Sequence, residues 1–161
     1  MGTLSISWDD PKALADAGRG LPGIEFLRTM VAGKLPSPPI ARLMGFRLVE
    51  VDHGLAVFEC EPGEQHYNPI GVVHGGLAMT LLDSCMGCSV HTVMPAGSGY
   101  TTLEAKVNLV RAITSSTGTI RAIGKLIHSG KSIATAEGRI VDAAGKLYAH
   151  GTTTCIILNG K

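Results

Sequence analysis

The feature that most constrains this chain is one long apolar segment, at about residues 74–94, that begins with His-Gly-Gly and stops before Pro95. Its length and its proline and glycine stop predict a single helix. Shorter runs on both sides alternate apolar and polar residues with the period of a β-strand, and short turns join most of them as antiparallel neighbours. The sequence therefore predicts an α+β domain in which a mostly antiparallel sheet of about six strands wraps around one helix. The strand-like runs are 44–51, 55–61, 101–111, 117–129, 132–142 and 146–158.

The first forty residues have a different character. Residues 1–21 are polar and contain several glycines, so they are expected to be loosely held. Residues 23–32 place apolar side chains at helical spacing, which predicts a short amphipathic helix. The prolines of residues 35–40 prevent that helix from continuing. The chain is accordingly divided into an N-terminal extension, residues 1–39, and one main domain, residues 40–158.

Composition and charge exclude several classes of protein. The 161 residues carry a formal net charge of +1, which provides no electrostatic reason to expect a nucleic acid or an anionic membrane as partner. There is no apolar stretch of about twenty residues and no signal-peptide pattern, so no membrane span is expected and a cytoplasmic location is favoured. Cys85 and Cys88 form a CxxC inside the predicted helix, where buried thiols are expected in place of a redox or zinc site. No metal site is predicted.

The segment from His66 to Asp83 carries a specific motif. It reads HYNPIGVVHGGLAMTLLD and satisfies HxNxxGxxHGGxxxxLxD. With one helix inside an antiparallel sheet, it resembles the hotdog-fold acyl-CoA thioesterases of the phenylacetate-catabolism type, over about residues 40–158. The resemblance implies hydrolysis of acyl-CoA thioesters to a free acid and coenzyme A, in aromatic or fatty acid metabolism. It also implies active sites shared within a homodimer, which can pair into a homotetramer; coenzyme A belongs to the substrate, and no further cofactor is expected.

The two ends of this motif suit different steps of one reaction. His74-Gly75-Gly76 opens the helix, where backbone N–H groups lack intrahelical partners and can stabilise an oxyanion. Gly75 and Asp83 are eight residues apart, which is about 12 Å along a helix. Both can act on one thioester only if they belong to different chains, with the two helices antiparallel across a two-fold axis. The structural alternative is that the glycines only ease helix–sheet contact and that Asp83 pairs with a buried arginine.

The resulting hypothesis assigns a role to each residue of the motif. The Gly75 N–H holds the thioester oxygen, and Asn68 orients the carbonyl or the attacking water. Asp83 of the partner subunit either attacks the carbonyl carbon or acts as general base for water. His74 orients Asn68 or the helix start, with proton transfer as its less favoured role.

Further residues are candidates for holding water and substrate. Thr101 matches a hydroxyl position at which similar enzymes hold the lytic water, with Thr102 as the alternative if the register differs by one. Gly76 and His66 are candidate substrate contacts, the histidine at the acyl entrance. The phosphates of coenzyme A need cations and amides at the mouth of the site. The candidates for this role are Arg111, followed by Ala112 where many relatives have proline, and the turn residues His128, Ser129, Gly130 and Lys131.

Two other functions compete with thioester hydrolysis. A hotdog domain can also dehydrate 3-hydroxyacyl thioesters, and His74 would then be the base. A non-catalytic acyl-CoA-binding domain of a regulator is the second alternative, although the near-neutral first forty residues provide no convincing DNA-binding module. The sequence does not specify the acyl group.

Overall fold

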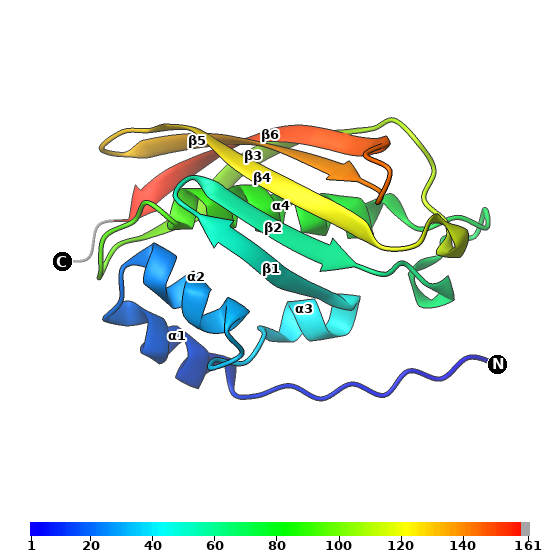
Figure 1. Ribbon diagram of the computed structural model, residues 1–161, viewed down its shortest axis with the longest axis horizontal. Helices are drawn as coiled ribbons and strands as arrows, with labels where there is room; N and C mark the ends of the chain where they lie inside the picture. Colours follow the sequence, from blue (N-terminus) through cyan, green and yellow to red (C-terminus); the bar gives the residue numbers. More distant parts are fainter. Residues whose placement is uncertain (159–161) are drawn as a thin grey trace.

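The computed structural model describes residues 1–158, in which one long helix lies against a six-stranded sheet (Figure 1). The sheet is antiparallel throughout, in the order β1-β2-β4-β5-β6-β3, which leaves β1 and β3 at its two edges. The helices are α1 (Pro11–Arg19), α2 (Gly23–Val31), α3 (Pro39–Met44) and α4 (Gly75–His91). The strands are β1 (Phe46–Asp52), β2 (Leu55–Cys60), β3 (Gly99–Leu109), β4 (Ile120–Ser129), β5 (Ile133–Val141) and β6 (Leu147–Leu158).

The main domain confirms the predicted order of one helix between two early and four late strands. The helix α4 is apolar because it packs against the sheet along most of its length, and Leu81, Leu82 and Met86 are fully buried. Many residues beneath it are small, such as Ala122 and Ala136, so the helix backbone approaches the strands closely. The core is therefore the layer between α4 and one face of the sheet.

Two glycines of the sheet make this close approach possible. Gly124 of β4 and Gly138 of β5 are direct partners in the ladder. A β-carbon at Gly124 would overlap the carbonyl group of Cys85 in α4, and one at Gly138 would lie 2.8 Å from Cγ of Met86. The first overlap involves helix backbone, which cannot move aside as a flexible side chain can.

Replacing Gly124 with alanine is therefore expected to lower the free energy of unfolding by about 3 kcal/mol, the upper end of the usual range for overpacking. Chemical denaturation monitored by circular dichroism measures this change. Gly99→Ala is the matched control, because a β-carbon there, also in a strand, would meet nothing within 4 Å. A Gly124→Ala variant as stable as Gly99→Ala would contradict the proposed packing.

The N-terminal extension contains more helix than predicted. Residues 11–19 were expected to be loosely held but form α1, whose first turn is capped by Asp10 accepting from the Lys12 N–H at 2.9 Å. The helix α2 ends at Val31, and Gly33 follows with φ +70°, so the chain leaves the helix before the Pro-rich stretch of residues 35–40. The last residues of that stretch begin α3, with Pro39 in the first turn. Proline is compatible with the first turn of a helix, because the N–H it removes has no intrahelical acceptor there. The predicted helix at residues 23–32 is confirmed as α2.

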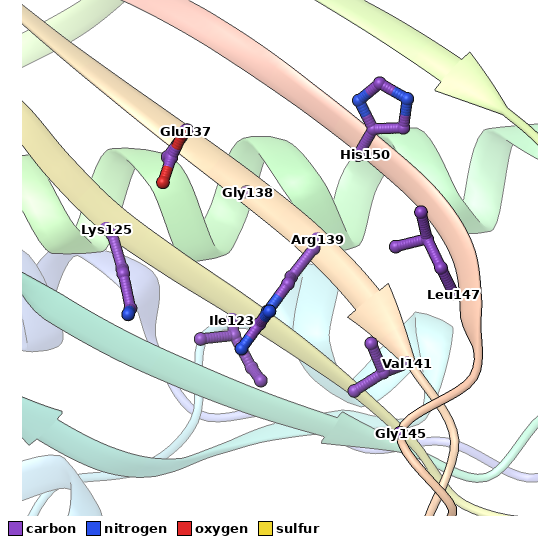
Figure 2. Close-up of a pocket in the computed structure, with 9 residues that line it drawn as sticks. All are labelled: Ile123, Lys125, Glu137, Gly138, Arg139, Val141, Gly145, Leu147 and His150. Atoms are coloured by element: carbon purple, nitrogen blue, oxygen red, sulfur yellow. The ribbon is translucent and has the colours of Figure 1, made fainter.

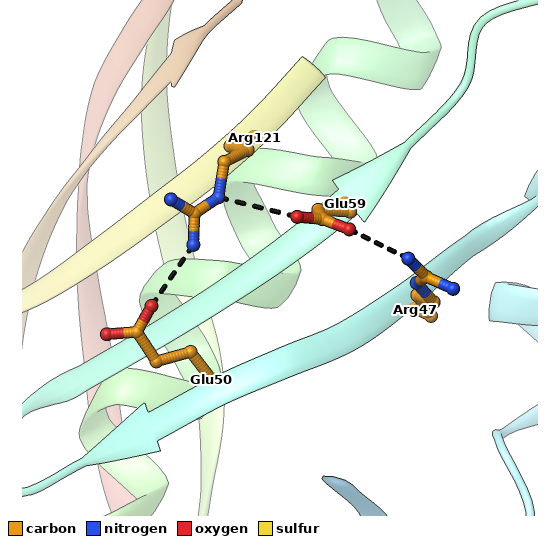
Figure 3. Close-up of polar contacts among 4 residues, drawn as sticks. All are labelled: Arg47, Glu50, Glu59 and Arg121. Atoms are coloured by element: carbon orange, nitrogen blue, oxygen red, sulfur yellow. Dashed lines mark hydrogen bonds and ion pairs between the residues drawn. The ribbon is translucent and has the colours of Figure 1, made fainter. Parts of the chain in front are cut away.

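The face of the sheet opposite α4 is polar in its β1–β2–β4 region. Figure 3 shows Arg121 of β4 between two carboxylates, with Nη2 donating to Glu50 at 3.1 Å and Nε 3.6 Å from Glu59. Arg47 donates to the other oxygen of Glu59 at 2.9 Å. Because these ion pairs face solvent and are partly exposed, each contributes about 1 kcal/mol or less to the free energy of unfolding. No helix of residues 1–158 is long and apolar enough to cross a membrane.

Candidate active site

The N-terminus of α4 leaves one backbone donor without a partner. His74 is the N-cap, and its Nδ1 accepts from the Gly76 N–H at 2.9 Å. The loop before it is held in place by the His74 N–H, which donates to the carbonyl of His66 at 2.7 Å. Within residues 1–158 the Gly75 N–H has no hydrogen-bond acceptor. The Gly75 amide is therefore the free backbone donor at this helix end, where the helix dipole adds partial positive charge.

Asn68 shapes the loop that faces this amide. Its Oδ1 accepts from the N–H groups of Ile70 at 3.1 Å and Val72 at 3.3 Å, which closes a tight turn with Gly71 at φ +81°. The side-chain NH₂ is the part of Asn68 that this turn does not use. Asn68 and Gly75 line one hollow of about 300 Å³ together with Arg111. The structure thus places Asn68, His74, Gly75 and Arg111 around one hollow.

Asp83 lies on the exposed face of α4, and its Oδ1 accepts a hydrogen bond from Thr102 Oγ1 of β3 at 2.9 Å. The hydroxyl beside the acid is that of Thr102, so the alternative register is correct and the preference for Thr101 is wrong. In the ladder with β6, Thr102 lies opposite the fully buried Cys155, and Thr101 lies opposite Ile156. Because neighbouring side chains on a strand point to opposite faces, only Thr102 points towards α4.

The donor and the acid do not meet within one chain. Asp83 does not line the hollow of Gly75 but a separate one, of about 360 Å³, on the other half of α4. The seven intervening residues are all helical, and the eight steps from Gly75 to Asp83 separate the two groups by about 12 Å along the axis.

Two predicted substrate contacts are structural instead. His66 is buried, its Nδ1 accepts from the Gly63 N–H at 3.0 Å, and its Nε2 lies 3.1 Å from the carbonyl oxygen of Met44. Both ring nitrogens are engaged, so His66 is not an acyl-entrance residue. The Gly76 N–H is taken by His74 and is not offered to a substrate. Neither contact is readable from sequence, because each depends on how a loop folds back.

The candidate contacts for coenzyme A lie at opposite ends of the sheet. Arg111 follows the end of β3 and donates to the carbonyl of Leu147 at 3.3 Å. The turn of residues 128–131 joins β4 to β5 beside the Thr102 end of the sheet. On the neighbouring strand β6, Ala149 lies opposite Leu109 and Cys155 lies opposite Thr102. These six residue steps separate the two ends of the sheet by about 20 Å. The Gly130 N–H donates to the carbonyl of Ile133 at 2.9 Å, so that amide, predicted as an anion donor, closes its own turn instead.

The CxxC pair is embedded in α4. Burial and the neighbouring Asp83 raise the pKa of Cys88 to about 12, and burial raises the pKa of Cys85 further still. Such thiols remain protonated and are poor nucleophiles and metal ligands. No group of three or more His, Cys, Asp or Glu side chains suited to a metal ion occurs among residues 1–158.

One buried histidine, His66, and one half-buried histidine, His91, make stability dependent on pH. Burial lowers the pKa of His66, with its bond to Met44 acting in the opposite direction, and burial lowers the pKa of His91. Unfolded histidine titrates near about 6.5, so below that pH the unfolded chain binds more protons than the folded one. The stabilisation is therefore complete above about pH 6.5 and decreases as pH falls towards the lowered folded values.

The melting temperature is accordingly expected to fall between pH 7.5 and pH 5.5, where carboxylates do not yet titrate. Differential scanning calorimetry at several pH values measures the fall. His91→Phe keeps the ring that packs edge-on against Phe26 at 5.9 Å but removes its titration. A fall of undiminished size in His91→Phe would exclude His91 as a contributor.

A hollow of about 370 Å³ lies on the outer face of the sheet (Figure 2). Lys125 of β4, Arg139 of β5 and His150 of β6 stand around it, together with Glu137. Because α4 covers the opposite face, this hollow is separated from Gly75 and Asp83 by the whole thickness of the sheet.

The hollow beside Asp83 contains residues that the sequence did not indicate as functional. The helices α1, α2 and α3 contribute Leu14, Phe26, Met30 and Ile40 to its lining. The apolar spacing of residues 23–32 signalled only that this helix packs against something, not that it adjoins the acid.

One helix inside a curved antiparallel sheet, with a donor at the helix start and an acid on its exposed face, defines the hotdog class of thioesterases. Residues 70–149 match the thioesterase superfamily. A Saccharolobus solfataricus protein assigned as an esterase is 30% identical over 122 residues, 76% of this chain and 85% of that protein. The 1,4-dihydroxy-2-naphthoyl-CoA hydrolase of Listeria monocytogenes is 27% identical over 114 residues, 71% of this chain and 91% of that enzyme.

A solved structure from Ralstonia eutropha, assigned as a thioesterase related to phenylacetic acid degradation, has a TM-score of 0.72 and 26% identity. The match covers 81% of this chain and 98% of that one. The chain belongs to the thioesterase superfamily and has the hotdog fold, which confirms the resemblance inferred from its motif.

Proposed function

We propose that this protein hydrolyses acyl-CoA thioesters at sites shared between two copies of the chain. The observation that carries the proposal is the pairing of an unpartnered Gly75 N–H with an exposed Asp83 on one face of α4, about 12 Å apart. A two-fold axis midway between them brings the Gly75 of each subunit to the Asp83 of the other. The Listeria relative, named as a hydrolase of a naphthoyl-CoA, supports acyl-CoA as the substrate class.

The surface around this midpoint supports the pairing. Met79 lies halfway between Gly75 and Asp83 and its side chain is 49% exposed, unusually high for an apolar residue of α4. The edge strand β3 runs alongside, with Leu103 57% and Leu109 48% exposed. An unpaired edge strand beside exposed apolar side chains is a surface suited to a second copy of the chain.

The charges on the edge strand β3 also suit its pairing with the β3 of a second copy. Thr102 lies beside Asp83, and Leu109 is the side chain that a β-carbon at Gly75 would meet, so the midpoint on β3 falls near Ala105. An axis through Ala105 places Glu104 opposite Lys106 of the partner subunit in an antiparallel ladder. Opposite charges facing each other across strands stabilise such a pairing.

The reaction follows from this arrangement. The Gly75 N–H and the Asn68 NH₂ hold the thioester oxygen and polarise the carbonyl. Asp83 of the partner subunit, oriented by Thr102, takes a proton from water as the oxygen of that water bonds to the carbonyl carbon. The C–S bond then breaks and the departing thiolate takes up the proton. Direct attack by Asp83, through an anhydride that water then cleaves, satisfies the same geometry.

The same two-fold symmetry would bring the two groups of candidate coenzyme A contacts, Arg111 and residues 128–131, close together. Arg111 lies near Gly75, and residues 128–131 lie at the Asp83 end of the sheet. When Gly75 approaches the Asp83 of the partner subunit, Arg111 approaches the partner's 128–131 turn. Arg111 and Lys131 are therefore proposed to bind the phosphates of one coenzyme A from two subunits.

A thiol-release assay over a panel of acyl-CoA thioesters tests the proposal, with the product identified by mass spectrometry. Free acid and coenzyme A in equal amounts are expected. An enoyl product without free thiol would assign dehydration, and tight binding without turnover would assign a non-catalytic acyl-CoA-binding domain.

Gly75→Pro is expected to lower kcat about 100-fold relative to Gly75→Ala, the usual effect of losing one oxyanion donor. Proline removes the N–H at the first helical position, where helices accept it, and His74 already has the extended backbone that precedes a proline, with ψ 134°. Both variants place a β-carbon about 2.5 Å from the same Leu109 methyl group, so alanine controls for that contact. Equal kcat values in the two variants would exclude the Gly75 amide as a donor.

A further inference from the structure

The hollow beside Asp83 has the composition of a binding site for an apolar group. It measures about 360 Å³ and adjoins Asp83, Ser84 and Cys88 on α4. The other lining side chains come from α1, α2 and α3, from the sheet and from the end of α4, among them Leu14, Phe26, Met30, Ile40, His91 and Tyr100. Asp83 is the only carboxylate among the lining residues, and the lining has no lysine or arginine.

The uncharged state of this lining has physical causes. Burial lowers the pKa of His91, so its ring is neutral at neutral pH. Burial raises the pKa of Tyr100 and of Cys88, so neither ionises. The aromatic walls support one another, with Phe26 and His91 5.9 Å apart, and Phe46 and Phe58 5.7 Å apart. The hollow is therefore a preformed apolar chamber that ends at one carboxylate.

We infer that this chamber binds the acyl group of the substrate and selects uncharged alkyl or aryl chains, an inference that rests on the proposed thioester hydrolysis. The reacting carbonyl must lie at Asp83, so the acyl chain attached to it can extend into the hollow that Asp83 adjoins. The subunit that supplies Asp83 then holds the acyl group. The partner supplies the Gly75 amide and Arg111, and the coenzyme A end lies between that Arg111 and the Lys131 of the subunit that supplies Asp83.

The helices α2 and α3 determine this selectivity. Phe26 and Met30 of α2 and Ile40 of α3 form the wall that faces α4 across the hollow, and all three precede residues 70–149, the part that matches the superfamily. Figure 1 shows α2 beside β1, on the side of the sheet that carries α4. The reaction is thus assigned to the segment from Asn68 to Asp83, and the choice of acyl chain to α2 and α3.

A longer acyl chain is expected to raise kcat/KM, and a charge at the end of the acyl chain is expected to lower it. Each methylene that enters the chamber is expected to raise kcat/KM roughly fourfold, from acetyl- to hexanoyl-CoA. Succinyl-CoA is expected to react at least about 100-fold more slowly than butyryl-CoA, because its carboxylate would enter an apolar chamber that already holds Asp83 and offers no cation.

Met30→Trp tests the location of the chamber, because a larger side chain there reduces its volume. Its kcat/KM is expected to fall about tenfold more for hexanoyl-CoA than for acetyl-CoA. Leu43→Trp is the matched control, since Leu43 of α3 is 51% exposed and does not line the hollow, and its selectivity is expected to equal that of the wild type. Calorimetry of S-hexyl-CoA, a thioether that cannot be hydrolysed, is expected to show weaker binding to Met30→Trp only.

The outcomes separate the chamber from the proposed reaction. One outcome is that no thioester is hydrolysed, while S-hexyl-CoA binds the wild type more tightly than coenzyme A does and loses that advantage in Met30→Trp. This result would support the assignment of the chamber and contradict the proposed hydrolysis. If thioesters are hydrolysed without dependence on chain length, or Met30→Trp affects acetyl- and hexanoyl-CoA equally while remaining folded, the reaction stands and the chamber assignment is overturned.

Discussion

Asp83→Asn is expected to lower kcat for acyl-CoA hydrolysis about 1,000-fold, because general base catalysis typically contributes 100-fold to 10,000-fold. The amide can still accept the hydrogen bond that Thr102 donates to Oδ1 at 2.9 Å, so the side chain keeps its position and loses only its basicity. Binding of S-hexyl-CoA should remain, since the chamber and the Gly75 amide are untouched. Stopped thiol-release assays provide the rate, and calorimetry the affinity.

Three further variants sharpen this test. Glu137→Gln removes a carboxylate from the outer face of the sheet and is expected to leave the rate unchanged. Thr102→Val removes only the hydroxyl that orients Asp83, and an intermediate loss is expected, whereas Thr101→Val should have little effect because its side chain points away from α4. Full activity in Asp83→Asn would exclude Asp83 as both nucleophile and base.

Met79→Lys is expected to separate the subunits and to lower activity at least about 100-fold at nanomolar protein concentrations. The two-fold axis proposed here passes beside Met79, so the variant would place two lysines against each other in an apolar contact. Analytical ultracentrifugation reports the subunit mass, and the thiol-release assay reports the activity of the same samples.

Leu43→Lys is the control for Met79→Lys, because Leu43 is 51% exposed on α3, close to the 49% of Met79, but lies outside the proposed interface. It should retain both the dimer and the activity. A Met79→Lys protein that is monomeric and fully active would show that one chain suffices for catalysis.

Mixing two inactive variants tests the shared site directly. In a heterodimer of Gly75→Pro and Asp83→Asn, one site carries both changes and the other carries neither. Random exchange makes half of the dimers heterodimers, so about a quarter of the wild-type activity is expected to return. Verified subunit exchange that restores no activity would contradict the two-fold arrangement.

Local patterns predicted the main domain well. The period of two identified all six strands, and the apolar run between Gly75 and His91 identified α4, because these patterns reflect one face packed on a core. The extension was predicted less well. Asp10-Pro11 and Pro38-Pro39 are helix-start signals, but they were read as loose or stiff chain, since proline permits both readings.

The sequence by itself determined the order of the long helix and the six strands, the superfamily motif and the separation of Gly75 from Asp83, because each of these depends on spacing along the chain. The tertiary structure alone decided that Thr102 and not Thr101 meets Asp83, that His66 is structural, and that α2 and α3 enclose a hollow beside the acid. These outcomes depend on contacts between segments far apart in the chain, where a shift of one residue in a strand reverses which side chains face the helix.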